Sequence, residues 1–134
     1  MERGVGIIKE IDKLGRIVIP KELRRALNIV EIEDLLEIYF EEGMIVLKKT
    51  SLEEINSGVA RKVDQLGRIV LPIELRRNLD IVEERDALEV FIDGDKIVLK
   101  KYEPACIFCG DARNIYSFKG KNICMNCIDD IKEI

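Results

Sequence analysis

Residues 12–27 read DKLGRIVIPKELRRAL, and residues 64–79, which lie 52 positions further along, read DQLGRIVLPIELRRNL. The match extends outward from both stretches. When residue n is compared with residue n+52, residues 6–50 align with residues 58–102 without a gap, and 24 of the 45 pairs are identical. Two copies are too few for a solenoid, and a unit of about 45 residues is too small to bury a core alone. The two repeats are therefore expected to close on each other into one pseudo-symmetric domain.

Each repeat has the pattern of two strands, a short helix and two further strands. Gly15 suits the positive φ of a tight turn between GIIKEID and RIVIP. Pro20 suits a helix N-terminus, after which Leu23 and Leu27 share one helix face. LLEIYFEEGMIVLKK predicts two alternating strands around a turn at 42–43. The residues expected on the buried side or in the core also include Leu36, Ile38, Phe40, Ile45 and Leu47, and Leu75, Leu79, Leu88, Val90, Ile92, Ile97 and Leu99 in the second repeat.

The composition is that of a globular protein, with 47% apolar and 36% charged residues in a chain of 134. No apolar run approaches the roughly 20 residues of a membrane helix, and the start does not resemble a signal peptide. The expected location is the cytoplasm, in association with the nucleoid. The chain has no His, which removes the commonest general base, and it has no Gly-rich phosphate loop or nucleophile motif. It is not expected to be an enzyme.

The formal net charge of −4 hides a segregation of charge along the chain. Residues 6–27 carry a net charge of +3, and residues 28–43 carry −6. The second repeat has the same order, because residues 58–79 carry +3 and residues 80–95 carry −6. A basic block followed by an acidic block, twice, predicts two faces of opposite sign.

The phrase LGRIVIPKELRR, followed by the strand pair LEIYFEEGMIVLKK, resembles the AbrB/SpoVT-type swapped-hairpin family of bacterial transition-state regulators. The resemblance covers residues 6–50 and 58–102. In that family two chains interleave hairpins into one DNA-binding β-barrel, so the resemblance implies that one chain here supplies both halves. The expected fold is mainly β with short helices. It is a swapped-hairpin β-barrel built from two tandem β-β-α-β-β repeats, residues 1–50 and 58–103, joined by a linker at 51–57.

Basic residues recur at matched places in both repeats, and a guanidinium group matches phosphate oxygens and guanine edges bidentately. By the resemblance, these places match the positions through which the family contacts DNA. The first repeat carries Glu10 where the second carries Lys62, which predicts unequal halves. An alternative is that Arg25 forms only an ordinary surface pair with Glu22. The duplication of the arginines in both repeats favours a DNA-binding role over ordinary surface ion pairs. The predicted DNA-binding residues are Lys9, Arg16, Arg24, Arg25, Arg61, Lys62, Arg68, Arg76 and Arg77.

The stretch CIFCGDARNIYSFKGKNICMNC holds all four cysteines, in the spacing C-x2-C-x14-C-x2-C. Paired CxxC motifs at this separation let four thiolates converge on Zn²⁺. Four thiolates leave no open position, so one structural Zn²⁺ per chain is expected. Two disulfides, an iron–sulfur cluster and a CxxC redox pair are the alternatives. The predicted ligands are Cys106, Cys109, Cys124 and Cys127.

Residues 104–134 would form a small module around this metal, which would supply its folding free energy. Gly110 permits a tight turn, residues 114–123 are expected as a hairpin, and residues 127–134 as a helix. The arrangement is similar to small treble-clef or zinc-ribbon modules, including the one at the front of Clp-type unfoldases, where it serves dimerisation and docking.

These features predict a DNA-binding transcription regulator. The family resemblance implies that it binds flexible, AT-rich promoter DNA by shape more than by a strict base code. The alternatives are an antitoxin that represses its own operon and a barrel adaptor for protein partners without a DNA role. The expected partner is double-stranded DNA, with self-association or protein docking through the zinc module, and with no membrane or small-molecule substrate.

Overall fold

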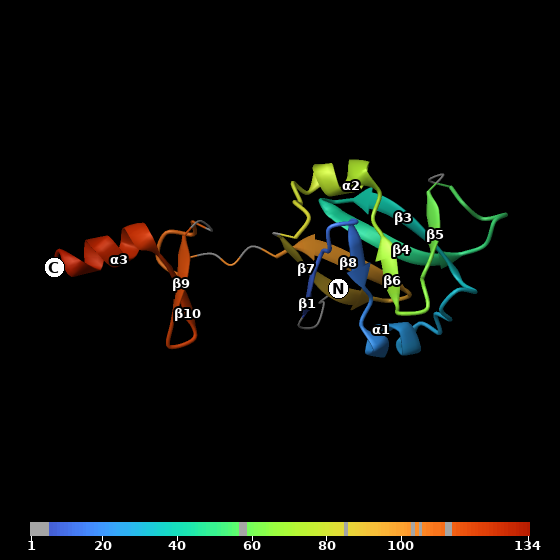
Figure 1. Cartoon of the computed structure of the whole chain (residues 1–134), viewed down its shortest axis with the longest axis horizontal. Coiled ribbons are helices and arrows are strands. Elements are labelled where there is room, and N and C mark those ends of the chain that lie inside the picture. The colour runs from blue at the N-terminus through green and yellow to red at the C-terminus, as the bar shows by residue number, and fades with distance from the viewer. Residues whose placement is uncertain (1–5, 57–58, 85, 103, 105, 112–113) are drawn as a thin grey trace. The chain divides into compact units, whose positions relative to one another are not determined.

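The computed structural model describes residues 6–56, 59–84, 86–102, 104, 106–111 and 114–134, and it divides into two compact units, residues 1–102 and 103–134. The first unit contains the predicted β-β-α-β-β order twice (Figure 1). In the first repeat the elements are β1 (Ile7–Glu10), β2 (Arg16–Val18), α1 (Lys21–Ala26), β3 (Leu35–Glu41) and β4 (Met44–Thr50). In the second they are β5 (Ala60–Lys62), β6 (Arg68–Val70), α2 (Ile73–Asn78), β7 (Ala87–Asp93) and β8 (Lys96–Lys101).

The strand order of the main sheet has the symmetry of the repeat. In the described residues this curled sheet runs β1-β7-β8-β4-β3-β5 (Figure 1). Exchanging each strand for its counterpart 52 residues away gives the same order reversed. The pseudo-two-fold axis passes between β4 and β8, where Val46 lies opposite its own counterpart Val98. Strands β2 and β6 form a separate antiparallel pair, in which Ile17 lies opposite its counterpart Ile69. The two repeats thus form one compact unit with pseudo-two-fold symmetry.

The Leu-Gly-Arg turn has the expected geometry, but the strands on either side of it do not form a local hairpin. Gly15 has φ of 78°, and the Asp12 N–H donates to the Arg16 carbonyl at 3.0 Å. Beyond the turn, β1 pairs with β7 and β2 with β6, both from the other repeat. Strand β5 likewise pairs with β3. This exchange is the swapped-hairpin arrangement that the resemblance implied, and it places the core between the repeats.

The core consists of aliphatic side chains contributed about equally by both repeats. The predicted Ile45, Leu47, Ile97 and Leu99 are at most 1% exposed. The helix leucines pack against the core from its edge. The buried cluster is Ile11, Ile17, Ile19, Ile29, Leu36, Ile38, Ile45, Leu47, Val63, Ile69, Leu71, Ile81, Leu88, Val90, Ile97 and Leu99, flanked by Leu23, Leu27, Val59, Leu75 and Leu79.

Two side chains of β3 differ from what simple alternation predicts. Phe40 is 38% exposed, although Ile45, which lies opposite it on β4, is fully buried. Glu37, on the opposite face, is only 6% exposed. Its carboxylate accepts the backbone N–H of Asn56 at 2.8 Å, so the segment that joins the repeats covers it. Alternation assigns the face of a strand, but it does not reveal which loop covers that face.

A truncated chain of residues 1–103 should be a folded monomer, because each repeat supplies the strand and core residues that the other lacks. A chain of residues 1–50 should be unfolded or should self-associate. Sedimentation and circular dichroism measure both properties. An obligate dimer of the 1–103 chain would show that the repeats pair between chains instead.

The second unit is a hairpin followed by a helix, as the sequence predicted. Strands β9 (Ile115–Phe118) and β10 (Lys121–Cys124) pair around Lys119 and Gly120, whose φ angles are 51° and 79°. Helix α3 (Met125–Lys132) follows directly. In the part of the chain that the structure describes, no helix is long and apolar enough to cross a membrane.

Candidate nucleic-acid interface and metal centre

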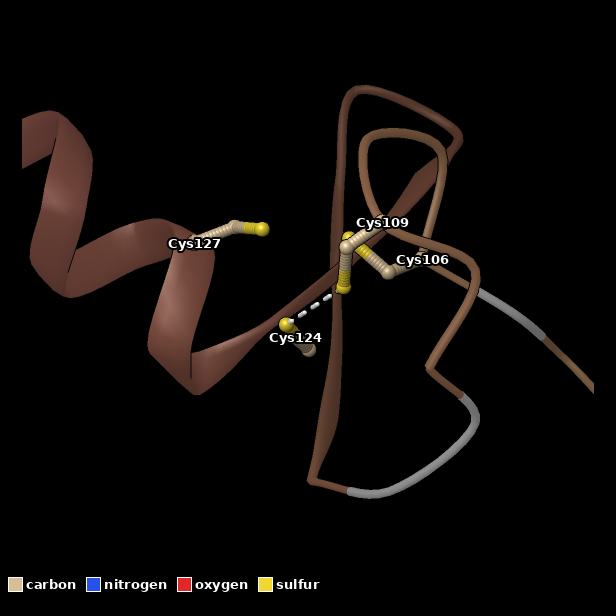
Figure 2. A group of neighbouring side chains, drawn as sticks. All are labelled: Cys106, Cys109, Cys124 and Cys127. Carbon is tan, nitrogen blue, oxygen red and sulfur yellow. Dashed lines mark hydrogen bonds between the residues drawn. The ribbon is translucent and has the colours of Figure 1, made fainter.

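The four cysteines come together in the second unit. All four Sγ atoms lie within 4.8 Å of one another. Cys106 and Cys109 come from a loop, Cys124 ends β10, and Cys127 lies in the first turn of α3, with the sulfur atoms turned toward one common space (Figure 2). The Sγ atoms of Cys109 and Cys124 are 3.6 Å apart, well beyond the roughly 2.05 Å of a disulfide. The arrangement fits one tetrahedral ion.

The loop of the first CxxC motif directs backbone donors at sulfur. The Phe108 N–H donates to Cys106 Sγ at 3.4 Å, and Gly110, with φ of 79°, closes the loop by donating to the Cys106 carbonyl at 2.9 Å. The Cys124 backbone N–H and the other backbone donors lower the pKa of Cys106 to about 6. The adjacent Cys124 thiol raises the pKa of Cys127. The site thus favours a thiolate at Cys106 over a second one at Cys127, and a bound cation would compensate the charge of further thiolates.

Arg16 and Arg68 are held by the acidic residue that begins each Leu-Gly-Arg turn. Arg16 Nε donates to Asp12 Oδ2 at 2.7 Å, and Arg68 Nε donates to Asp64 Oδ2 at the same distance. Desolvation alone would raise the pKa of Asp12, but hydrogen bonds from the backbone and side chain of Arg16 outweigh it and hold that pKa below its ordinary value. The same balance lowers the pKa of Asp64. Each of these contacts is made by Nε, and a guanidinium carries further N–H donors on its two Nη atoms.

Arg24 and Arg76 lie against the turn of the opposite repeat. Arg24 Nε donates to the Ile19 carbonyl at 2.9 Å, its Nη1 pairs with Glu31, and its side chain is 14% exposed. A Cβ at Gly67 would lie 2.6 Å from the Arg24 Cζ atom, so the guanidinium packs directly on that glycine. The contact with Gly67 bridges the two repeats.

Arg76 makes the same set of contacts in the other direction. Its Nε donates to the Leu71 carbonyl at 2.9 Å, its Nη1 pairs with Glu83, and it packs on Gly15. Its side chain is 13% exposed. The Arg–Glu separation of seven residues occurs in both repeats, and this was the sequence signal that could have indicated the pairing.

The other predicted basic residues are more open to solvent. Arg25 and Arg77 are exposed on their helices, next to the two packed arginines. Arg61 and Lys62 are exposed on β5, whereas Lys9 on β1 is half-buried. The structure therefore divides eight of the nine predicted positions into three kinds: exposed side chains, side chains held by a turn aspartate, and side chains packed between repeats. Lys9, which is half-buried, is the ninth.

A family model described as "Antidote-toxin recognition MazE, bacterial antitoxin" matches residues 8–54 and again residues 60–106. The two matched segments make up more than half of the chain. The chain belongs to this family. It holds two copies of the MazE/AbrB domain, one for each repeat.

Among the relatives, the putative transition state regulator Abh of Bacillus subtilis (strain 168) is 62% identical over 56 residues, covering 40% of this chain and 60% of Abh. The transition state regulatory protein AbrB of the same strain is 61% identical over 49 residues, covering 37% of this chain and 50% of AbrB. Stage V sporulation protein T, also from this strain, is 51% identical over 49 residues, covering 36% of this chain and 27% of that protein.

These relatives confirm the AbrB/SpoVT resemblance, and two of them are described as transition state regulators. The chain spans at most 60% of the length of each. A solution structure of PHS018 from Pyrococcus horikoshii covers 78% of this chain and 98% of its own, at 20% identity and a TM-score of 0.40, a similarity too low to define the fold.

Proposed function

We propose that this MazE/AbrB-family chain is a DNA-binding transcription regulator whose two repeats present one pseudo-two-fold basic surface to duplex DNA. The observation that supports this most directly is the duplication itself. Both repeats carry arginine at the same positions, and the fold relates those positions by its axis. Because guanidinium groups bind phosphates along both strands of a duplex, a two-fold set suits DNA, which has its own local two-fold axes.

The proposed interface consists of the nine predicted positions, in graded roles. Four exposed side chains would reach phosphates directly, namely Arg25, Arg77, Arg61 and Lys62. Arg16 and Arg68 offer their Nη donors from a fixed position. Arg24 and Arg76 support the surface by holding the turns, and Lys9 extends it. The exposed Glu10 lies where the second repeat has Lys62, so the first half of the surface should contribute less.

The salt dependence of binding tests this proposal. If roughly six phosphates are neutralised, the logarithm of the affinity should fall with the logarithm of the salt concentration with a slope near −5. Fluorescence anisotropy of the full chain with an AT-rich promoter duplex, titrated with salt, gives the slope. Binding that does not change with salt, or no binding at low salt, would rule out the DNA role.

We also propose that the four cysteines hold one structural Zn²⁺. The converging sulfurs and the backbone donors around Cys106 support a closed four-thiolate site. The ion would cross-link the loop, the hairpin and the helix of a unit that is too small to fold on a hydrophobic core alone. In this role the unit serves self-association or docking onto a protein partner.

The description of the family model favours one second candidate, an antitoxin that regulates its own operon. In this chain the two-repeat domain is followed by the four-cysteine unit. Co-expression with the product of the adjacent gene, followed by co-purification, separates the candidates. A stable complex that neutralises a toxic partner would favour the antitoxin, and its absence would favour the regulator.

A further inference from the structure

The β2–β6 pair, which we call the central ribbon, lies on the pseudo-two-fold axis. Its registered pairs are Arg16 with Val70, Ile17 with Ile69, and Val18 with Arg68. Two further hydrogen bonds lengthen it. The Ile19 N–H donates to the Gly67 carbonyl at 2.9 Å, and the Leu71 N–H donates to the Gly15 carbonyl at 3.0 Å. The ribbon is therefore a regular two-stranded element that joins the turns of both repeats.

The two faces of the central ribbon differ sharply. Ile17 and Ile69 are 1% exposed and belong to the core. Alternation along each strand then places the other four side chains on the outer face. Val18 is 36% exposed and Val70 41% exposed. The outer face thus presents a valine and an arginine from each strand, and the core does not require these valines to be apolar.

The spacing of the two valines suits the base-pair repeat of DNA. Val18 and Val70 lie diagonally across the axis, since each is opposite the arginine of the other strand. Diagonal neighbours in an antiparallel pair are roughly 7–8 Å apart, which is about two steps of roughly 3.4 Å along duplex DNA. Each valine would therefore meet a different base pair.

We propose, on the basis of the proposed function, that the central ribbon enters the major groove and that Val18 and Val70 contact the 5-methyl groups of thymine. The major groove, about 12 Å wide, admits a two-stranded ribbon, and apolar contact with this methyl group distinguishes thymine there. Arg16 and Arg68 lie beside the valines on the ribbon and are fixed through Nε by Asp12 and Asp64, so their Nη atoms would donate to the flanking phosphates. The face thus combines guanidinium donors with an apolar centre, and the apolar centre matches A·T-rich sequence.

Two duplexes of alternating A·T pairs test the inference with the full-length chain, one made with thymine and the other with uracil, which lacks only the 5-methyl group. The unmodified protein should bind the thymine duplex about 10-fold more tightly, because two methyl groups are removed from water. The variant Val18→Ala/Val70→Ala should bind both duplexes with equal affinity. Since these valines lie on the outer face, the variant should fold normally, which circular dichroism checks.

The matched control is Val30→Ala/Val82→Ala, which changes another symmetry-related pair of valines, 45% and 41% exposed. It should keep the preference for thymine. Equal binding of the two duplexes by the unmodified protein would overturn the inference and leave the DNA role intact. A preference that persists in the Val18→Ala/Val70→Ala variant would also overturn it. The inference would also be overturned if the Val18→Ala/Val70→Ala variant changed only in oligomeric state. That result would identify the ribbon face as a contact with another protein chain. Failure to bind either duplex at low salt would instead reject the proposed function.

Discussion

Replacing Cys124 with serine should abolish zinc binding and unfold residues 104–134, while the two-repeat domain keeps its structure. Structural zinc contributes roughly 10–16 kcal/mol of binding free energy in small modules, and that free energy is the folding free energy of the module. The protein purified from a reducing host should contain about one Zn²⁺ per chain. Elemental analysis measures the metal, and limited proteolysis shows whether the C-terminal unit is folded.

Asn126→Ser is the matched control, because Asn126 lies exposed in the first turn of α3, two residues after Cys124, and is not one of the four cysteines. This variant should retain zinc and resist proteolysis. A protein free of zinc whose C-terminal unit is nevertheless folded would contradict the zinc assignment. Visible absorption from bound iron would identify the iron–sulfur alternative instead.

Two double variants that differ by one position along the helix should affect different properties. Arg25→Ala/Arg77→Ala removes exposed guanidinium groups, so the free energy of unfolding should change by no more than about 0.5 kcal/mol. If two phosphate contacts are lost, affinity for DNA should fall roughly 10- to 100-fold at about 0.1 M salt, and the salt slope should become shallower by about 2.

Arg24→Ala/Arg76→Ala should act mainly on stability. Each of these side chains is mostly buried, donates to a backbone carbonyl and pairs with a glutamate. Hydrogen bonds to charged groups contribute about 1.5–3 kcal/mol each, so the double variant should lose at least about 3 kcal/mol of unfolding free energy. Urea denaturation measures this loss. Equal loss of stability in both double variants would contradict the division of the arginines into packed and exposed groups.

The sequence alone was sufficient to predict the features that depend on a local residue pattern or on the internal repeat. Comparison at an offset of 52 residues revealed the repeat, and the two-fold strand order follows it. The helix after Pro20 and the turn at Gly15 are set by the backbone preferences of proline and glycine, and both are present. The cysteine spacing predicted the convergence of Cys106, Cys109, Cys124 and Cys127, because two CxxC loops can bring their sulfurs together only in a few ways.

Only the tertiary structure decided which partner each local element acquires. Nothing in the stretch GIIKEID indicates that β1 pairs with β7, because strand periodicity identifies a buried face but not the neighbouring strand. Arg24 and Arg25 are adjacent and chemically identical. Arg24 nevertheless packs on Gly67 of the second repeat, whereas Arg25 is exposed. Sequence determined the units and their chemistry. Contacts between the repeats determined which charges remain available to a partner, because burial and pairing depend on residues distant in the chain.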